Sequence, residues 1–292
     1  MIPSQNIVAW SKTTPWAESR QVEQDLIIAR ALVELFSDPF LGAELRFRGG
    51  TALNKLHFPK PLRYSEDIDL VRTTAGPIGP VLDQVRDILV PWLGKPRFDQ
   101  SEVAPKLRFR VKPEDESSDA MIRLKVEINT REREAYDPPA VLPFKVENPW
   151  FSGTAEISTF SNEELLATKL RALLQRNKGR DLIDLSHALE IFTKLNAKRI
   201  VELFARYLAL SNQGISRAEA EQRMFQKLER PDFLADVRPL LTAEEADRLD
   251  DKAATAAFTA VFARLIRLIP GDPWANTPAM LKQFGLTDLA EQ

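Results

Sequence analysis

Residues Phe47–Val71 read F-R-G-G-T-A-L-N-K-L-H-F-P-K-P-L-R-Y-S-E-D-I-D-L-V. It begins with a glycine pair, Gly49 and Gly50, before a short run with helical periodicity. It ends with two aspartates, Asp67 and Asp69, that one residue separates. Alternate residues of a β-strand project to the same face. The two carboxylates are therefore predicted to stand side by side, with the apolar residues of the strand facing the core.

Two carboxylates this close repel each other unless a proton or a cation lies between them. Mg²⁺ is the usual bridging cation, and it normally takes substrate phosphates as further ligands. A glycine turn at the start of a helix suits phosphate, because backbone N–H groups can approach it closely. We therefore predict that Asp67 and Asp69 hold Mg²⁺ or Mn²⁺, and that Gly49, Gly50 and Thr51 bind phosphates.

A second charged stretch, Ala167–Leu185, reads A-T-K-L-R-A-L-L-Q-R-N-K-G-R-D-L-I-D-L. Lys169 and Arg176 fall on one side of a predicted helix. After the N-K-G-R break, Asp181 and Asp184 are three residues apart and share a face of the next helix. A flexible ammonium with three donors suits a phosphate contact, and guanidinium groups could add bidentate ones.

The motifs R-G-G-T-A-L-x-K, R-Y-S-E-D-I-D-L, K-x-x-A-L-x-x-R and R-D-x-x-D-L occur in this order. Together they resemble the signatures of the AbiEii/AbiGii-type toxins, including the MenT-type enzymes, in the nucleotidyltransferase superfamily. The resemblance implies an α/β (α+β) fold: a mixed-sheet nucleotidyltransferase lobe, then an all-helical lobe, with an NTP in the cleft between them. It also implies a toxin that is paired with an antitoxin. Some members transfer nucleotides to the 3′ end of tRNA.

The resemblance also implies the roles of single residues. A third carboxylate is expected on a later strand, where Glu127 lies on the polar face of the predicted strand 121–130. Glu66 makes the motif S-E-D-I-D, so which acids bind metal stays open, although alternation favours the two aspartates. The expected metal ligands are Asp67, Asp69 and Glu127. The expected catalytic residues are these three with Lys169, Asp181 and Asp184. The expected NTP-binding residues are Gly49, Gly50, Thr51, Ser65, Lys169, Arg176 and Arg180.

We therefore predict a Mg²⁺-dependent toxin that transfers NMP from NTP to RNA, with the tRNA 3′ end favoured. Two alternatives stay open: transfer to a protein or small molecule by the same fold, and a non-enzymatic partner-binding module. The expected partners are NTP, RNA and a cognate antitoxin, and a monomer is favoured. Basic residues predicted to contact RNA are Arg108, Arg110, Arg123, Lys125, Arg171, Arg176, Lys178 and Arg180.

Composition sets the class of protein. The chain has 292 residues, of which 44% are hydrophobic and 28% charged, as in ordinary globular proteins. It has no cysteine, which excludes disulfides, thiolate zinc sites and cysteine nucleophiles. No apolar run reaches membrane-spanning length and the N-terminus lacks a signal-peptide pattern, so we expect a cytoplasmic protein.

Periodicity changes near Ser161, from mixed to helical, and predicts a nucleotidyltransferase-fold domain at 1–155 and a helical domain at 156–292. The proline-rich residues 138–149 are predicted to be an irregular connection, with a short strand near Phe144. A hairpin is predicted from two alternating runs joined by the polar link 113–119. The predicted strands are 45–48, 106–112 and 121–130, and the predicted helices are 18–36, 81–93, 165–175, 181–195, 198–210, 217–228 and 243–269.

Overall fold

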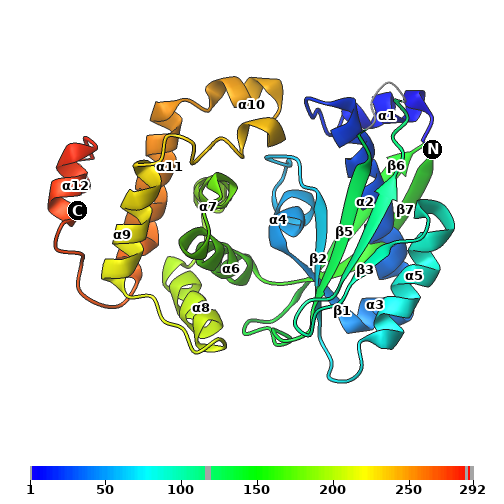
Figure 1. Cartoon of the computed structure of the whole chain (residues 1–292), viewed down its shortest axis with the longest axis horizontal. Helices are drawn as coiled ribbons and strands as arrows, with labels where there is room; N and C mark the ends of the chain where they lie inside the picture. The colour runs from blue at the N-terminus through cyan, green and yellow to red at the C-terminus, as the bar shows by residue number, and fades with distance from the viewer. Residues whose placement is uncertain (1, 116–119, 287–288, 290–292) are drawn as a thin grey trace. The chain divides into compact units, whose positions relative to one another are not determined.

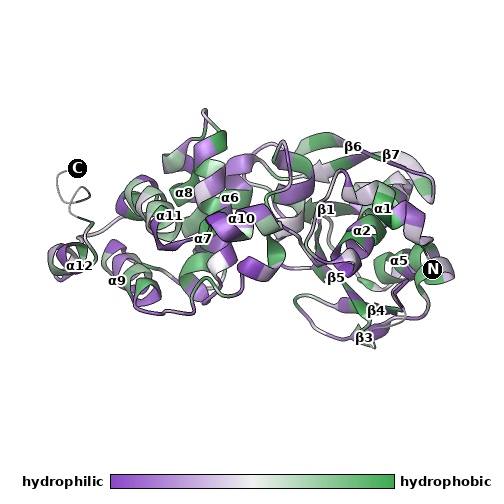
Figure 2. Cartoon of the chain, turned by 90° about the horizontal axis from the view of Figure 1, so that it is seen from above, coloured by the Kyte–Doolittle hydropathy of each residue, from purple (hydrophilic) through white to green (hydrophobic). Residues whose placement is uncertain are grey.

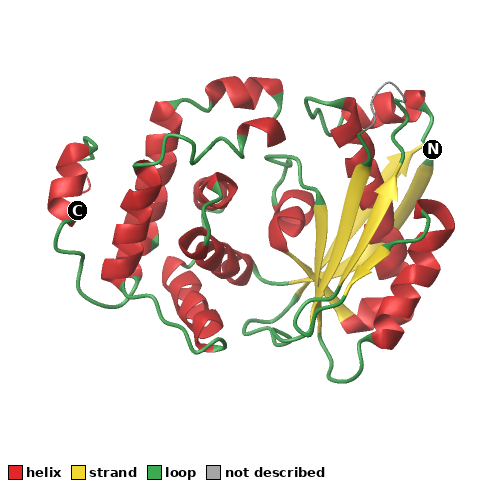
Figure 3. Cartoon of the chain, viewed as in Figure 1, coloured by secondary structure: helices red, strands yellow, loops and turns green. Residues whose placement is uncertain are grey.

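The structure is a computed structural model that describes residues 2–115, 120–286 and 289. The chain forms two compact units, residues 1–161 and 162–292. Strands, drawn yellow in Figure 3, lie in unit 1, whereas the described part of unit 2 consists of helices and loops. The fold class is therefore the predicted one, a mixed-sheet α/β unit followed by a helical unit.

In its described residues, unit 1 contains one seven-stranded mixed sheet, in the order β3-β4-β5-β2-β1-β7-β6. β1 pairs with β7 in parallel and with β2 antiparallel, and β2 pairs with β5 in parallel. The strands are β1 Leu45–Arg48, β2 Asp67–Arg72, β3 Arg97–Asp99, β4 Lys106–Val111, β5 Ile122–Asn129, β6 Ala140–Asn148 and β7 Phe151–Thr159. The helices are α1 Ser4–Ser11, α2 Ser19–Ser37, α3 Pro39–Glu44, α4 Gly49–Ala52 and α5 Gly79–Leu93, and a π-helical turn, Leu53–His57, continues α4.

The core of unit 1 lies between the sheet and helix α2. Figure 1 shows α2 and α5 along one face of the sheet and α4 on the other, beside β2. α2 carries hydrophobic residues along its length (green in Figure 2), among them Leu26, Ile28 and Leu32, which are fully buried. This helix covers the apolar side of the strands. The polar side chains of β2 and β5 stand on the opposite face, where the short helix α4 begins.

The predicted hairpin is confirmed for its strands, because β4 and β5 pair antiparallel; positions 116–119 of the polar link lie outside the described residues. The irregular connection predicted for 138–149 is wrong. Residues 140–148 instead form β6, which contains the short strand predicted near Phe144 and pairs with β7 over nine residue pairs, from Ala140↔Thr159 to Asn148↔Phe151. β6 is an edge strand. Pro143 is therefore tolerated, because an edge strand does not need every backbone N–H for the ladder.

The regular elements in the described residues of unit 2 are all helices or helical turns. The prediction of one long segment at 243–269 is wrong, because Asp250 caps a new helix by accepting a hydrogen bond from the N–H of Ala253 at 2.7 Å. A helix near the C-terminus also escaped prediction. The helices are α6 Asn162–Gln175, α7 Gly179–Ile191, α8 Ala197–Ala209, α9 Arg217–Leu228, α10 Ala243–Arg248, α11 Asp251–Arg264 and α12 Thr277–Gln283, with 3₁₀ turns at Arg238–Leu240 and Ile266–Leu268.

Among the residues described, no helix combines the length and the apolar character that a membrane crossing requires.

Candidate active site

Asp67 and Asp69 lie at the start of β2 and project to one face of the strand. Their side chains are 37% and 34% exposed. Ile68 and Leu70 alternate with them and are buried in the core. Glu66 precedes the strand and is exposed. The adjacent carboxylates on one face of β2 are therefore those of the two aspartates.

The glycine turn lies directly against Asp69. Gly49 has a φ of +82°, which L side chains rarely adopt. A Cβ atom at this position would lie 2.5 Å from Asp69 Oδ2 and 3.2 Å from Asp69 Cβ. Any other residue at position 49 would have to displace the carboxylate. The absence of a side chain thus keeps the backbone turn and the carboxylate in close contact.

The hydroxyl group of Thr51 connects the glycine turn to the beginning of β2. Thr51 Oγ1 lies 2.6 Å from Ser65 Oγ and donates a hydrogen bond to the backbone oxygen of Asp67 at 2.5 Å. Thr51 is buried and Ser65 is half-buried. The sequence predicts phosphate contacts for both hydroxyls. In the structure they contact each other and position the strand that carries the aspartates.

Asn54 organises the loop before β2, and the sequence reasoning missed it. Its Nδ2 atom donates to the backbone oxygen of Gly50 at 2.9 Å. Its Oδ1 atom accepts from the backbone N–H groups of Leu62 at 2.8 Å and Arg63 at 3.0 Å. The side chain is buried. One feature of the sequence could have indicated this role: Asn54 is a polar amide in the mostly apolar run A-L-N-K-L.

β5 brings Glu127 next to the aspartates. In the parallel ladder between β2 and β5, Asp69 is opposite Glu127 and Asp67 is opposite Lys125. Side chains at paired positions project to the same face of a sheet. The structure therefore brings together the three carboxylates that the sequence predicts as metal ligands, and it adds a lysine to them.

Lys125 lies among the three carboxylates. Its Nζ atom is 2.9 Å from Glu127 Oε2, 3.1 Å from Asp67 Oδ2 and 3.9 Å from Asp69 Oδ1. Lys106 Nζ, from β4, is 3.5 Å from the same Glu127 oxygen. The sequence places Lys125 among the residues predicted to contact RNA. In the structure its ammonium neutralises part of the charge of the carboxylates.

The electrostatics of these groups follow from burial and from Lys125. Burial raises the pKa of Asp69, and Lys125 opposes this shift. Burial also acts against the ionisation of Glu127, but the hydrogen bond and charge of Lys125 outweigh it and lower the pKa of Glu127. Burial disfavours the ammonium of Lys125, but Asp69 and Asp67 outweigh it and raise its pKa. The pKa values of Lys125, Asp69 and Glu127 thus depend on the charges of the neighbouring groups.

The second motif forms a buried ion network in unit 2. Lys169 Nζ lies 2.9 Å from Asp184 Oδ2 and 3.2 Å from Asp181 Oδ1. Arg176 makes a bidentate pair with Asp181, at 2.7 and 2.9 Å. Burial opposes the ionisation of Asp181, but Lys169 and Arg176 outweigh it and lower its pKa. Four residues singled out from the sequence are therefore in contact, and they join α6 to α7.

Two further basic residues are close to this network: Arg180, which precedes Asp181 in the sequence, and Lys227, which the sequence patterns did not indicate. Arg180 Nε is 3.9 Å from Asp236 Oδ2. Lys227 donates to the backbone oxygen of Arg176 at 2.9 Å and to Asn177 Oδ1 at 3.0 Å. Burial lowers the pKa of Lys227 to about 8. Lys227 therefore holds the end of α6, a role that no sequence pattern announces.

The carboxylate pair of β2 is suited to a hard divalent cation. Among the residues described, no group of three or more His, Cys, Asp or Glu side chains is arranged to hold a metal ion. Mg²⁺ needs only one or two protein carboxylates when water and substrate phosphates complete its coordination. Asp67 and Asp69 supply such a pair on a partly exposed face, so their oxygens fit Mg²⁺ or Mn²⁺.

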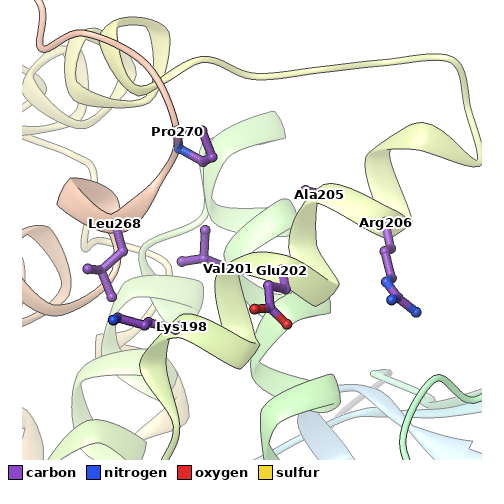
Figure 4. Close-up of a pocket in the computed structure, with 7 residues that line it drawn as sticks. All are labelled: Lys198, Val201, Glu202, Ala205, Arg206, Leu268 and Pro270. Carbon is purple, nitrogen blue, oxygen red and sulfur yellow. The ribbon is translucent and has the colours of Figure 1, made fainter.

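Unit 2 also contains a pocket of about 510 Å³ beside α8 (Figure 4). None of the residues that line it belongs to the two motifs, and Glu202 on its wall pairs with Arg199 at 3.0 Å. We assign no chemistry to it. The lining residues are Lys198, Val201, Glu202, Ala205, Arg206, Leu268 and Pro270.

Comparison with known proteins agrees with this fold. The family model described as nucleotidyl transferase AbiEii toxin, type IV toxin–antitoxin system, matches residues 30–262. Among solved structures, MenT4, a nucleotidyltransferase toxin from Mycobacterium tuberculosis, is similar with a TM-score of 0.64 and 18% identity, over 100% of this chain and 99% of that chain. A putative nucleotidyltransferase from H. pylori has a TM-score of 0.53 and 19% identity, over 86% of this chain and 97% of that chain. No curated protein matches the sequence.

Proposed function

This chain belongs to the family of AbiEii nucleotidyltransferase toxins of type IV toxin–antitoxin systems, and we propose that it transfers NMP from an NTP to RNA, with the tRNA 3′ end as the favoured acceptor. The observation that carries this proposal is the contact between the Gly49 turn and Asp69, one of the aspartate pair of β2. That contact places backbone suited to phosphate next to carboxylates suited to a divalent cation.

Asp67 and Asp69 would hold the Mg²⁺ or Mn²⁺ ion, which neutralises phosphate charge when it is bound. The amides of Gly49 and Gly50 are assigned to the outer phosphates of the NTP. The acceptor hydroxyl oxygen bonds to the α-phosphorus while the bond to the pyrophosphate oxygen breaks. Pyrophosphate leaves with the bonding electrons, and the hydroxyl proton passes to the medium.

Lys169, Asp181 and Asp184 belong to the proposed catalytic machinery, with Arg176 and Arg180 as NTP contacts. Support comes from the network itself, in which Lys169 is held by both aspartates at 2.9 and 3.2 Å. A lysine fixed in this way keeps its orientation and can contact phosphate without a large loss of side-chain entropy. The aspartates would then position the lysine.

An RNA acceptor is supported by basic residues on the sheet face that carries the aspartates. In the β4–β5 ladder, Arg108 is opposite Lys125 and Arg110 is opposite Arg123. All three arginines are exposed, although Arg108 also pairs with Asp99 at 2.5 Å. The remaining two are suited to phosphate contacts outside the carboxylate cluster. The protein as a whole has a net charge of −2, so such contacts have to be local.

The family also implies a cognate antitoxin, which we propose as the protein partner of this chain.

The decisive experiment for nucleotidyl transfer incubates the full chain with each α-³²P-labelled NTP, Mg²⁺ and total tRNA, with the Asp67→Asn/Asp69→Asn variant as the blank. We expect label in tRNA that RNase removes and protease does not. Label that survives RNase and disappears with protease would show that the acceptor is a protein and not RNA. Absence of label in every fraction would contradict nucleotidyl transfer.

A further inference from the structure

The carboxylate cluster of unit 1, Asp67, Asp69 and Glu127, contains the ammonium group of Lys125. Lys125 Nζ is within 3.1 Å of carboxylate oxygens on two strands, Asp67 Oδ2 of β2 and Glu127 Oε2 of β5. It is 3.9 Å from a third, Asp69 Oδ1. The Lys125 side chain is only 21% exposed, so it lies between the strands and does not extend into solvent.

The backbone determines this position. Lys125 is paired with Asp67 in the parallel ladder, and Glu127 follows two residues later on the same strand and face. An ammonium from this position meets carboxylates on both sides. Glu127 Oε2 also faces Lys106 at 3.5 Å. The oxygen of Glu127 that faces the cluster is therefore engaged by two ammonium groups.

We propose that Lys125 takes the place that a second divalent ion would have between β2 and Glu127, so that Asp67 and Asp69 hold a single divalent ion. Glu127 is then a positioning residue for Lys125, and it is not a metal ligand. This inference rests on the proposed function, because it concerns the ion that the aspartates hold there. It revises the prediction from the sequence, in which Glu127 completes the metal site.

Charge supports a single ion. Three carboxylates face two ammonium groups, Lys125 and Lys106, which leaves one net negative charge in the cluster. One divalent ion reverses this charge, and a second would add two more positive charges beside two ammonium groups. Mg²⁺ needs ligand oxygens at about 2.0–2.1 Å. A second ion at Glu127 would thus compete with Lys125 for the same oxygens.

The test counts bound metal ions and does not rely on activity. Mn²⁺ is titrated into the full chain, with and without an α,β-methylene NTP analogue, and bound Mn²⁺ is measured by electron paramagnetic resonance. Ions bound by the analogue alone are subtracted. We expect one Mn²⁺ per wild-type chain and two per chain of Lys125→Met, because this change removes the ammonium that lies between Glu127 and the two aspartates while keeping about the same side-chain volume. Lys106→Met, which removes an ammonium that contacts only Glu127 in the cluster, should still bind one.

A double variant makes the test specific. Lys125→Met combined with Glu127→Gln removes both the ammonium and the carboxylate, and should return the count to one. Circular dichroism and thermal unfolding establish that each variant is folded, and Lys125→Gln replaces Lys125→Met if the latter does not fold. Two ions in the wild type, or one ion in the folded Lys125 variants, would overturn the inference alone. No Mn²⁺ in any variant would contradict the metal site of the proposed function itself.

Discussion

Gly49 and Asp69 are in such close contact that a single added carbon atom cannot be accommodated between them. The Cβ position of Gly49 lies 2.5 Å from Asp69 Oδ2, and its φ of +82° is one that glycine adopts without strain. Two residues that are 20 positions apart are thus part of one structural unit. The glycine turn and the aspartate pair, which are separate motifs in the sequence, form one site.

The first prediction follows from this contact. Gly49→Ala should lower NMP transfer at least tenfold, about 1.4 kcal/mol of transition-state stabilisation, because the methyl group displaces the Asp69 carboxylate. Gly94→Ala is the matched control: Gly94 has a φ of +79° and no atom within 4 Å of its Cβ position. Both variants are expected to lose about 1–3 kcal/mol of stability because of the positive φ, measurable by urea unfolding. Equal activities of the two folded variants would contradict a role for the contact.

The aspartates are expected to be essential for chemistry and dispensable for folding. Asp67→Asn or Asp69→Asn should reduce transfer on the order of a thousandfold or more, because each removes a ligand of the proposed ion. Unfolding free energy should change little, since the loss of carboxylate repulsion offsets the loss of the Lys125 contact. Asp99→Asn, which affects a carboxylate paired with Arg108, is the control. Full activity of either aspartate variant would exclude the two-carboxylate site.

Lys169 pairs with Asp181 and Asp184 and is also proposed to contact NTP. Two variants distinguish the structural role from the proposed role in NTP binding. Lys169→Met should destabilise unit 2 by about 3–5 kcal/mol, because it leaves Asp181 and Asp184 buried with less compensating charge. It should also weaken NTP binding. Adding Asp184→Asn removes one of those carboxylates and should recover part of the stability, measured by urea unfolding, but no transfer. Recovery of both stability and transfer would show that Lys169 acts only on the fold.

Because of Lys227, the free energy of unfolding should vary with pH in the alkaline range. Burial is the largest cause that lowers its pKa from the usual 10.5 to about 8; Asp181 opposes the shift, and Arg223 and Arg230 add to it. Between about pH 8 and 10.5 the unfolded chain binds more protons at this group, so its contribution to the free energy of unfolding rises with pH. Urea unfolding of Lys227→Met should lack this rise. Equal pH slopes for wild type and variant would contradict the shift.

The exposed arginines of the β4–β5 face should bind the acceptor. Arg110→Glu and Arg123→Glu should raise the KM for tRNA while leaving NTP affinity unchanged, and transfer at low tRNA should fall steeply with salt. Each lost phosphate contact should reduce the slope of log K against log salt by about 0.7–0.9. Arg20→Glu, on α2 and 42% exposed, serves as the control. An unchanged KM for tRNA in both variants would place the acceptor elsewhere.

The local features of this protein can be predicted from short stretches of its sequence. Alternation in D-I-D-L predicts the side-by-side aspartates, and helical periodicity predicts most helices of unit 2, because both depend on residues within a few positions of each other. Spacing likewise predicts that Lys169 and Arg176 share one helix side and that Asp181 and Asp184 share a face of the next helix. Proline misled the prediction for β6, since a local rule cannot show that a strand lies at the edge of a sheet.

Contacts between residues that are far apart in the chain follow from the tertiary structure. Whether Lys125 faces solvent or the aspartates depends on the register of β5 against β2, and a shift by one residue would turn every side chain of the strand to the other face. The same holds for Lys227, which reaches the end of α6 from α9. Register and helix packing are set by the burial of the whole core, so they depend on residues far apart in the chain and no single motif contains them.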